Sequence, residues 1–177
     1  MPESFAPGQH GCGAPRVHTR PLRAADLDSV LAIQRAAYGD AYQESAAVLG
    51  RKLALAPRAC WLAEIDGQPV GYVFAHPWHD LAPPPLHVEL VPVAAVAQLA
   101  FVHDLAVAPA ARGAGVAAAL FSRVRQWSAQ ARHRRMLLVA LKDALGFWQR
   151  HGFRALARSL PPGYGDGACL MERALVS

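Results

Sequence analysis

The sequence is short of lysine and cysteine and lacks a long uninterrupted apolar run. Two of the 177 residues are lysine and three are cysteine, namely Cys12, Cys60 and Cys169. An odd number of widely separated cysteines without a CxxC pair argues against a disulfide framework and against a structural zinc site. The most apolar stretch, residues 86–102, is broken by a glutamate, a proline and a glutamine, which excludes a membrane-spanning helix there. We therefore predict no metal and no membrane partner.

Long runs of like charge are also absent, although the chain is basic. The formal net charge is +5, the excess comes from arginine, and no five consecutive residues carry the same charge. A basic balance favours anionic partners, among which the phosphates of a cofactor are one candidate. The absence of a charge run argues against a nucleic-acid-binding tail, and we expect no nucleic-acid partner. The first residues lack the basic and apolar regions of a secretory signal, which favours a cytoplasmic location.

The length and composition fit one globular domain. A hydrophobic fraction of 53% over 177 residues is enough to build a core without a disulfide or metal. Residues 1–15 are rich in glycine and proline and predict a disordered lead-in, whereas residues 16–177 are predicted to form the domain.

Apolar periodicity and turn residues predict the order of the secondary-structure elements. The Asp66-Gly67 pair predicts a tight hairpin turn, and three consecutive prolines exclude regular structure in part of the long connection over 76–98. The predicted order is a mixed α+β arrangement, not a regular alternation. The predicted elements are strand 16–21, helices 27–39 and 44–55, strands 60–65, 70–75 and 99–107, helix 116–131, strand 136–141, helix 143–150, and strands 153–157 and 168–175.

The segment from Leu105 to Ala117 carries the sharpest chemical signal. A buried strand runs through a glycine turn into a long helix, and Gly113 and Gly115 let a ligand approach the backbone. The first N–H groups of the helix have no intrahelical partner, so they suit a pyrophosphate. Two alternatives remain open. The same residues fit the G-x-G-x-x-A dinucleotide motif, although only 34 residues follow Asp143, too few to complete that sheet, or the glycines serve packing alone.

Two motifs in order resemble the GNAT superfamily of N-acetyltransferases. Residues 112–117 match its R/Q-x-x-G-x-G/A signature, residues 104–109 look like its strand four, and residues 144–153 are similar to its A-x-x-[FL]-Y-x-x-x-G-F motif. The resemblance covers residues 16–177. It implies an α+β fold with a mixed, mostly antiparallel central sheet, helices on both faces, and a splay between strands four and five. It also implies acetyl-CoA as co-substrate and a primary amine of a small molecule or peptide as acceptor, attacked directly in a ternary complex.

The resemblance implies roles for the residues of the preceding strand and of the first motif. Leu105, Ala106 and Val107 would lie beside the pantetheine arm, with the N–H of Val107 as oxyanion donor. For Arg112 the alternative is a solvated turn residue. The residues implied to hold the pyrophosphate are Arg112, Gly113, Ala114, Gly115, Val116 and Ala117.

Direct attack by an amine requires a base, and the departing thiolate requires an acid. Strand alternation predicts that His103 shares a face with Leu105 and Val107, toward the acetyl group, which makes His103 the candidate base. A core histidine is the alternative, favoured about equally. Asp104 is predicted on the opposite face as a structural partner, unless a β-bulge redirects it.

The second motif departs from the family at its tyrosine, which is Trp148 here. An indole N–H cannot protonate a leaving thiolate. We expect Trp148 either to pack on the pantetheine arm or to fill the core. Tyr164 is the candidate substitute acid, with a surface tyrosine as the alternative; otherwise the thiolate leaves to solvent.

The acceptor and the assembly are less determined by the sequence. Tyr38, Asp40, Tyr42 and Glu44 between the first two helices suit a cationic amine but also suit a wet surface. The missing tyrosine favours a second function class, a non-catalytic acyl-CoA-binding module, and a dinucleotide-binding oxidoreductase is the third. Exposed edges of the C-terminal strands would support a homodimer.

Overall fold

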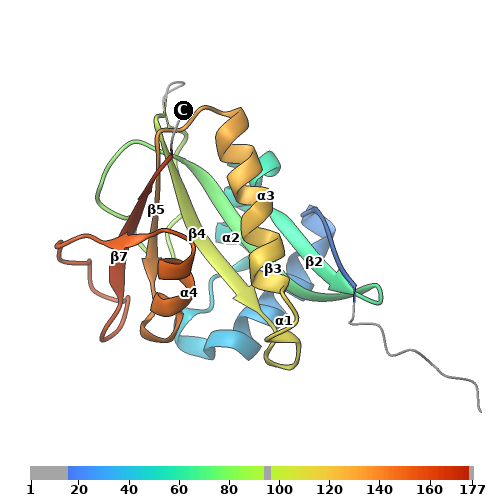
Figure 1. Cartoon of the computed structure of the whole chain (residues 1–177). Helices are drawn as coiled ribbons and strands as arrows, with labels where there is room; N and C mark the ends of the chain where they lie inside the picture. The colour runs from blue at the N-terminus through green and yellow to red at the C-terminus, as the bar shows by residue number, and fades with distance from the viewer. Residues whose placement is uncertain (1–15, 94–96, 176–177) are drawn as a thin grey trace, which may run out of the picture.

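The computed structural model describes residues 16–93 and 97–175, which form a twisted sheet with helices on both sides (Figure 1). The predicted lead-in over residues 1–15 lies outside the described residues. The strands are β1 Val17–Pro21, β2 Trp61–Ile65, β3 Gln68–Trp78, β4 Leu99–Val107, β5 Arg135–Ala140, β6 Arg154–Ala155 and β7 Cys169–Ala174. The helices are α1 Leu27–Tyr38, α2 Ala46–Leu55, α3 Val116–Gln130 and α4 Leu145–Arg150.

The described strands form a 7-stranded sheet in the order β1-β2-β3-β4-β5-β7-β6. Neighbouring strands are antiparallel except β4 and β5, which are parallel. This arrangement confirms the predicted mixed, mostly antiparallel α+β fold. Two elements differ in length from the prediction by three residues or more: β3 spans Gln68–Trp78, and β6 spans only Arg154–Ala155.

Local chemistry explains where several elements begin and end. Asp66 and Gly67 have φ values of 51° and 75°, as the tight turn between β2 and β3 requires. Gly39 ends α1 with φ 74°, a conformation that glycine adopts without steric penalty. The hydroxyl of Ser45 accepts a hydrogen bond from the N–H of Val48 at 3.3 Å, so α2 begins with a side-chain cap.

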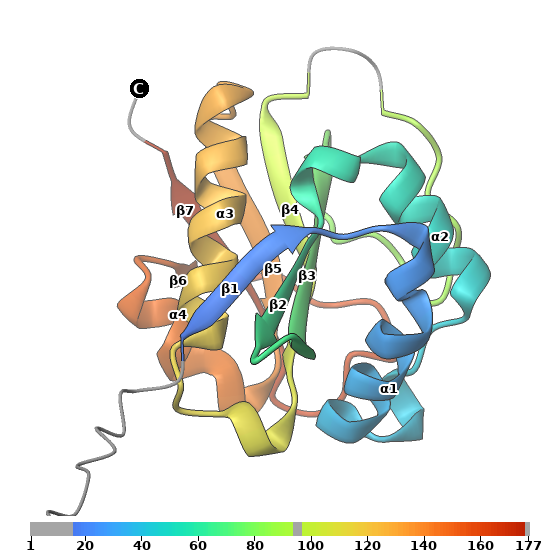
Figure 2. The same ribbon diagram turned by 90° about the vertical axis from the view of Figure 1, so that its right-hand side faces the viewer.

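The sheet separates two apolar layers (Figure 2). On one face α1 and α2 pack over Leu62, Tyr72 and Phe74. On the other face α3 and α4 cover Val73 and Ala75. Alternation along β3 produces this division, because successive side chains of a strand point to opposite faces. The candidate site lies along β4, where the sheet opens toward β5.

Candidate active site

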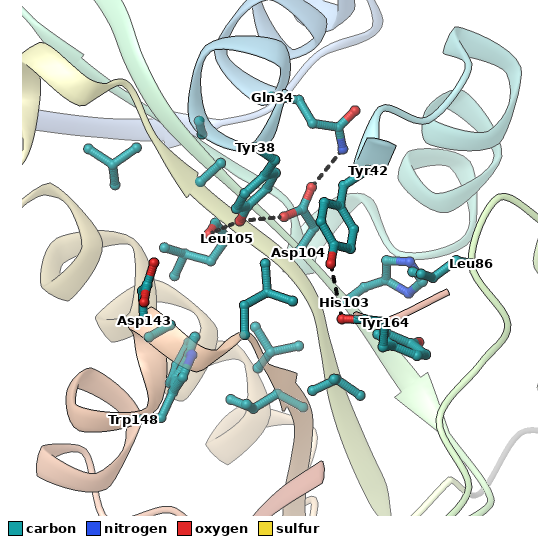
Figure 3. Close-up of a pocket in the computed structure, with 18 of the residues that line it drawn as sticks. Gln34, Tyr38, Tyr42, Leu86, His103, Asp104, Leu105, Asp143, Trp148 and Tyr164 are labelled. Carbon is teal, nitrogen blue, oxygen red and sulfur yellow. Dashed lines mark hydrogen bonds between the residues drawn. The ribbon is translucent and has the colours of Figure 1, made fainter. Parts of the chain in front are cut away.

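A cleft opens between β4 and β5 because their pairing stops before either strand ends. The last paired residues are Val102 and Leu138, yet β4 continues to Val107 and β5 to Ala140. The backbone edge of β4 beyond Val102 is therefore unpaired toward β5. A cavity of about 570 Å³ occupies this region. Its walls come from α1, the 39–45 segment, β4, β5, α4 and the loops around Leu86 and Tyr164 (Figure 3).

Two residues of β4 direct backbone groups into this cleft. The N–H of Ala108 donates to the carbonyl of Val70 on β3 at 2.8 Å. Backbone groups alternate in direction along a strand, so Leu105 and Val107 point away from β3 and toward the cleft. The carbonyl of Leu105 accepts the hydroxyl of Tyr38 at 2.7 Å, which agrees with that direction.

The glycine turn before α3 is open on its outer side. Gly113 and Gly115 have φ values of 83° and 82°, and a Cβ built on either would meet no atom within 4 Å. Gly115 is the N-cap of α3, whose first N–H groups carry the positive end of the helix dipole. Arg112 is exposed and borders the cavity. The turn is therefore free to receive an anion.

A β-bulge changes the predicted direction of one side chain in β4, that of His103. Phe74 pairs with Asp104 and Ala75 pairs with Val102, so His103 has no partner in β3. Alternation resumes after the bulge with Leu105 on the α3 side of the sheet. The prediction that His103 shares a face with Leu105 and Val107 is therefore wrong. His103 lies with Asp104 on the α1–α2 side, because the bulge considered for Asp104 redirects His103 instead.

Asp104 is the centre of a network of neutral donors (Figure 3). Its carboxylate accepts hydrogen bonds from Gln34 at 2.9 Å, from Tyr38 at 3.1 Å and from Tyr72 at 2.5 Å. Burial and the nearby Asp104 raise the pKa of both tyrosines, so they stay protonated donors. Asp104 lies on the face that alternation predicts relative to Leu105, and its partners are neutral side chains of α1 and β3.

His103 belongs to a second network, made with side chains from α2, β3 and the segment just before α2. Its imidazole is 2% exposed and its Nε2 lies 2.6 Å from Nζ of Lys52 and 3.7 Å from Glu44. The ammonium of Lys52 also contacts both carboxylate oxygens of Glu44. On the other side, Nδ1 of His103 lies 3.4 Å from Nε2 of His76.

The charges in this network set the pKa values of its members. Burial opposes ionisation of Glu44, but the neighbouring His103 ring and the charge and hydrogen bond of Lys52 lower its pKa to about 2. Burial lowers the pKa of His103, and the positive charge of Lys52 lowers it further. Burial also lowers the pKa of His76, to about 3. Glu44 and Lys52 are thus a buried ion pair beside two neutral histidines.

The two residues proposed around the leaving group both border the cavity. Tyr164 is buried, and its hydroxyl donates to the carbonyl of Pro84 at 2.7 Å. Burial raises its pKa above the usual value of a tyrosine. Trp148 is 6% exposed and packs edge-on against Phe121 and Phe153. Trp148 is therefore both a core residue and part of the cavity wall.

Sequence reasoning missed Lys52 and His76. The available signal for Lys52 was its position on the apolar stripe of its helix, since Val48, Leu49 and Leu53 are the other buried residues there. Among residues 16–93 and 97–175, no three His, Cys, Asp or Glu side chains are grouped as a metal site would require. None of the helices in the described part of the chain has the length and hydropathy needed to cross a membrane.

Comparisons with known proteins identify a family and a fold. A sequence model of the acetyltransferase (GNAT) family matches residues 27–153. No curated protein sequence matches the chain. Among solved structures, Ard1 from Thermoplasma volcanium is similar with a TM-score of 0.71 at 17% identity, covering 91% of this chain and 99% of that one.

Two further structures of this fold contain coenzyme A or an acyl-CoA. The paia N-acetyltransferase from Thermoplasma acidophilum, in complex with coenzyme A, has a TM-score of 0.69 at 12% identity and covers 90% of this chain and 99% of its own. The GphF GNAT-like decarboxylase, in complex with isobutyryl-CoA, has a TM-score of 0.72 at 21% identity and covers 89% and 98%. At these identities the likeness shows the fold.

Proposed function

Because the chain belongs to the GNAT acetyltransferase family, we propose that it transfers an acetyl group from acetyl-CoA to a primary amine of a small molecule or peptide. The observation that carries the proposal is the unpaired edge of β4, which leads directly into the open glycine turn at the start of α3. A strand edge and a helix N-terminus together match the amide-bearing arm and the diphosphate of coenzyme A.

The residues that would hold the co-substrate follow from this geometry. The backbone groups of Leu105 and Val107 are directed into the cleft, with Ala106 between them pointing to β3. Trp148 closes the opposite wall. The diphosphate would be bound by N–H groups of the turn and first helical residues, namely Arg112, Gly113, Ala114, Gly115, Val116 and Ala117.

The amine attacks the thioester carbon in its neutral form. The carbonyl oxygen gains negative charge as the new bond forms, and a backbone N–H in a water-poor cleft stabilises that charge. Val107 is the donor we propose, because its N–H faces the cleft on the edge of β4 that is unpaired toward β5. The thioester C–S bond then breaks, and the sulfur leaves as thiolate.

We propose His103 as the group that finally takes the proton of the amine. His103 borders the cavity, so the proton of the amine would reach Nε2 of its ring, and the ammonium of Lys52 would then keep Glu44 as its partner. The amine loses one proton and His103 gains it, while Glu44 and Lys52 keep their charges. For Tyr164 we propose a wall role in place of the acid role that the sequence suggested, because its hydroxyl is directed to Pro84. The thiolate then takes its proton from solvent.

A glycine pair of equal strain tests the co-substrate site. Gly115→Ala and Gly67→Ala both force alanine into a left-handed conformation, with φ 82° and 75°, and neither Cβ meets an atom within 4 Å. Each should lower stability by about 1–2 kcal/mol. Only Gly115→Ala should weaken acetyl-CoA binding in calorimetry, by about tenfold (about 1.4 kcal/mol). Equal affinities in the two variants would refute this binding site.

Turnover decides between catalysis and binding alone. Trp148 in place of the family tyrosine favours a non-catalytic acyl-CoA-binding module as the second candidate function. A panel of primary amines and N-terminal peptides with acetyl-CoA, read by thiol release and by mass of the product, separates the two. Tight binding of acetyl-CoA with no acetylated product across the panel would favour the binding module.

A further inference from the structure

Lys52 lies outside both sequence motifs, yet its side chain is fixed between α2 and the sheet. Its side chain is 1% exposed, and that of Glu44 is 4% exposed. Lysine is almost never buried to this extent unless it is paired. Here the ammonium contacts the carboxylate of Glu44 and Nε2 of His103.

The positions of the hydrogens follow from the two ends of this chain of contacts. An ammonium group has donors only, so Nε2 of His103 must present its lone pair to Lys52. At the far end, the carbonyl of Pro77 only accepts, so Nδ1 of His76 carries a hydrogen and donates at 2.9 Å. A neutral His76 then has a lone pair on Nε2, which faces Nδ1 of His103. Both ends therefore require His103 to be neutral with its hydrogen on Nδ1.

The structure assigns Lys52 as a positioning residue that holds His103 in this neutral, Nδ1-protonated form. This role rests on the proposed function, in which His103 is the proton acceptor. An acceptor must be unprotonated before the amine arrives. Lys52 meets this requirement by placing a positive charge against Nε2, where a proton would otherwise bind, while Glu44 neutralises that charge.

Other titratable groups surround the pair, and none of them supplies a second cation. Asp104 follows His103 on β4, and the hydroxyl of Tyr72 on β3 donates to Asp104. The thiol of Cys60 lies beside Lys52 at the start of β2, and burial raises the pKa of this thiol to about 12. Tyr164 lies near Glu44. Lys52 is therefore the positive charge that controls His103, and removing it should leave Glu44, 3.7 Å away, as the dominant partner.

The test is side-chain nitrogen NMR of the full chain labelled with ¹⁵N-histidine, followed from about pH 5.5 to 8 around the ordinary histidine pKa. In the parent protein, the His103 signals should show a protonated Nδ1, an unprotonated Nε2 and no titration in this range. In Lys52→Met, the titration midpoint of His103 should rise into this range or above it, by about one pH unit or more. Assignment uses loss of the His103 signals in His103→Gln.

The double variant Lys52→Met/Glu44→Gln is the matched control. It removes both charges while keeping the side chains close to their original size, so His103 should be neutral again. Circular dichroism reports whether each variant is folded. If Lys52→Met alone does not fold, the parent protein still tests the assignment, because a His103 that titrates or carries its hydrogen on Nε2 would refute it.

Two results would overturn the assignment. One is a parent His103 that titrates near its ordinary pKa or carries its hydrogen on Nε2. The other is a folded Lys52→Met whose His103 midpoint is unchanged. The NMR experiment needs no substrate, so an inactive protein with the expected tautomer would refute the proposed function and leave the role of Lys52 intact. If both hold, the acid limb of the pH–rate profile in Lys52→Met should move with the NMR midpoint.

Discussion

The two halves of the cleft are built from different materials. The β4–α3 half consists of backbone: an unpaired strand edge, two glycines with left-handed φ, and the first turn of a helix. The α1–α2 half consists of buried side chains that hydrogen-bond one another, around Asp104 and around Lys52. The first half needs little more than the right local conformation. The second needs charges and hydrogens to match across elements far apart in the sequence.

The largest expected effect comes from a change in the side-chain half. Glu44→Gln removes the counter-charge of Lys52 and leaves a buried cation, so the free energy of unfolding should fall by about 3–5 kcal/mol. Urea unfolding measures the change. Asp40→Asn is the control, because Asp40 pairs with Arg35 at a surface where the two side chains are 88% and 67% exposed. That change should stay within about 0.5 kcal/mol. Equal losses of unfolding free energy in the two variants would mean that the buried pair stabilises the fold no more than the exposed pair.

The next effect concerns Gly71, which supports the backbone half of the cleft. Gly71 lies under the start of α3, and a Cβ there would meet Val116 at 2.8 Å and the carbonyl oxygen of Ala106 at 2.9 Å. Gly71→Ala should therefore lower stability by about 1–3 kcal/mol and weaken acetyl-CoA binding, because α3 must shift. Calorimetry and thermal unfolding measure the two effects. Gly146→Ala on α4, where the nearest atom is 3.5 Å away, should not destabilise. Unchanged binding in Gly71→Ala would show that the turn tolerates movement of α3.

A more gradual effect appears as pH falls. Burial lowers the pKa of His76 to about 3 and lowers that of His103, so the unfolded chain takes up protons before the folded one. The stability that these neutral histidines contribute is complete above about pH 6.5 and is lost as pH falls toward their folded values, by up to about 1.4 kcal/mol per pH unit for each. Urea midpoints measured between these limits should decline, and less steeply in His76→Gln. A flat profile would contradict the neutral network.

The smallest expected effect concerns Arg112. The residue is exposed, so its attraction to a phosphate is screened by solvent. Arg112→Gln should weaken acetyl-CoA binding by about two- to fivefold at low salt, with a smaller difference at high salt. Arg150→Gln, on the exposed side of α4, is the matched control and should change little. A loss above tenfold would mean that side chains contribute as much as the backbone on that side of the cleft.

The backbone half could be predicted from the sequence because its chemistry is local. Leu105 to Ala117 contains the strand, the turn glycines and the helix start within one segment, and β4 has the predicted bounds Leu99–Val107. The order of elements and the mixed sheet could be predicted for the same reason, since periodicity and turn residues are properties of short windows.

The side-chain half could not be predicted, because its partners are distant in the sequence. Lys52 meets His103 across 51 positions, and no short window contains both. The bulge at His103 depends on how β4 pairs with β3, so period-two alternation misplaced that side chain. Glu44 was identified as an acceptor-site candidate but not as the counter-ion of Lys52.

Gln34 joins the two polar networks, and its chemistry gives α1 a single docking orientation. The Nε2 of this buried side chain donates to Asp104, while its Oε1 accepts the backbone N–H of Glu44 at 2.9 Å. An amide has one donating end and one accepting end, so turning it by half a revolution would oppose like with like at both contacts. Gln34 therefore fixes how α1, which forms one wall of the cavity, docks on the sheet, and with it the distance between Asp104 and the backbone of Glu44.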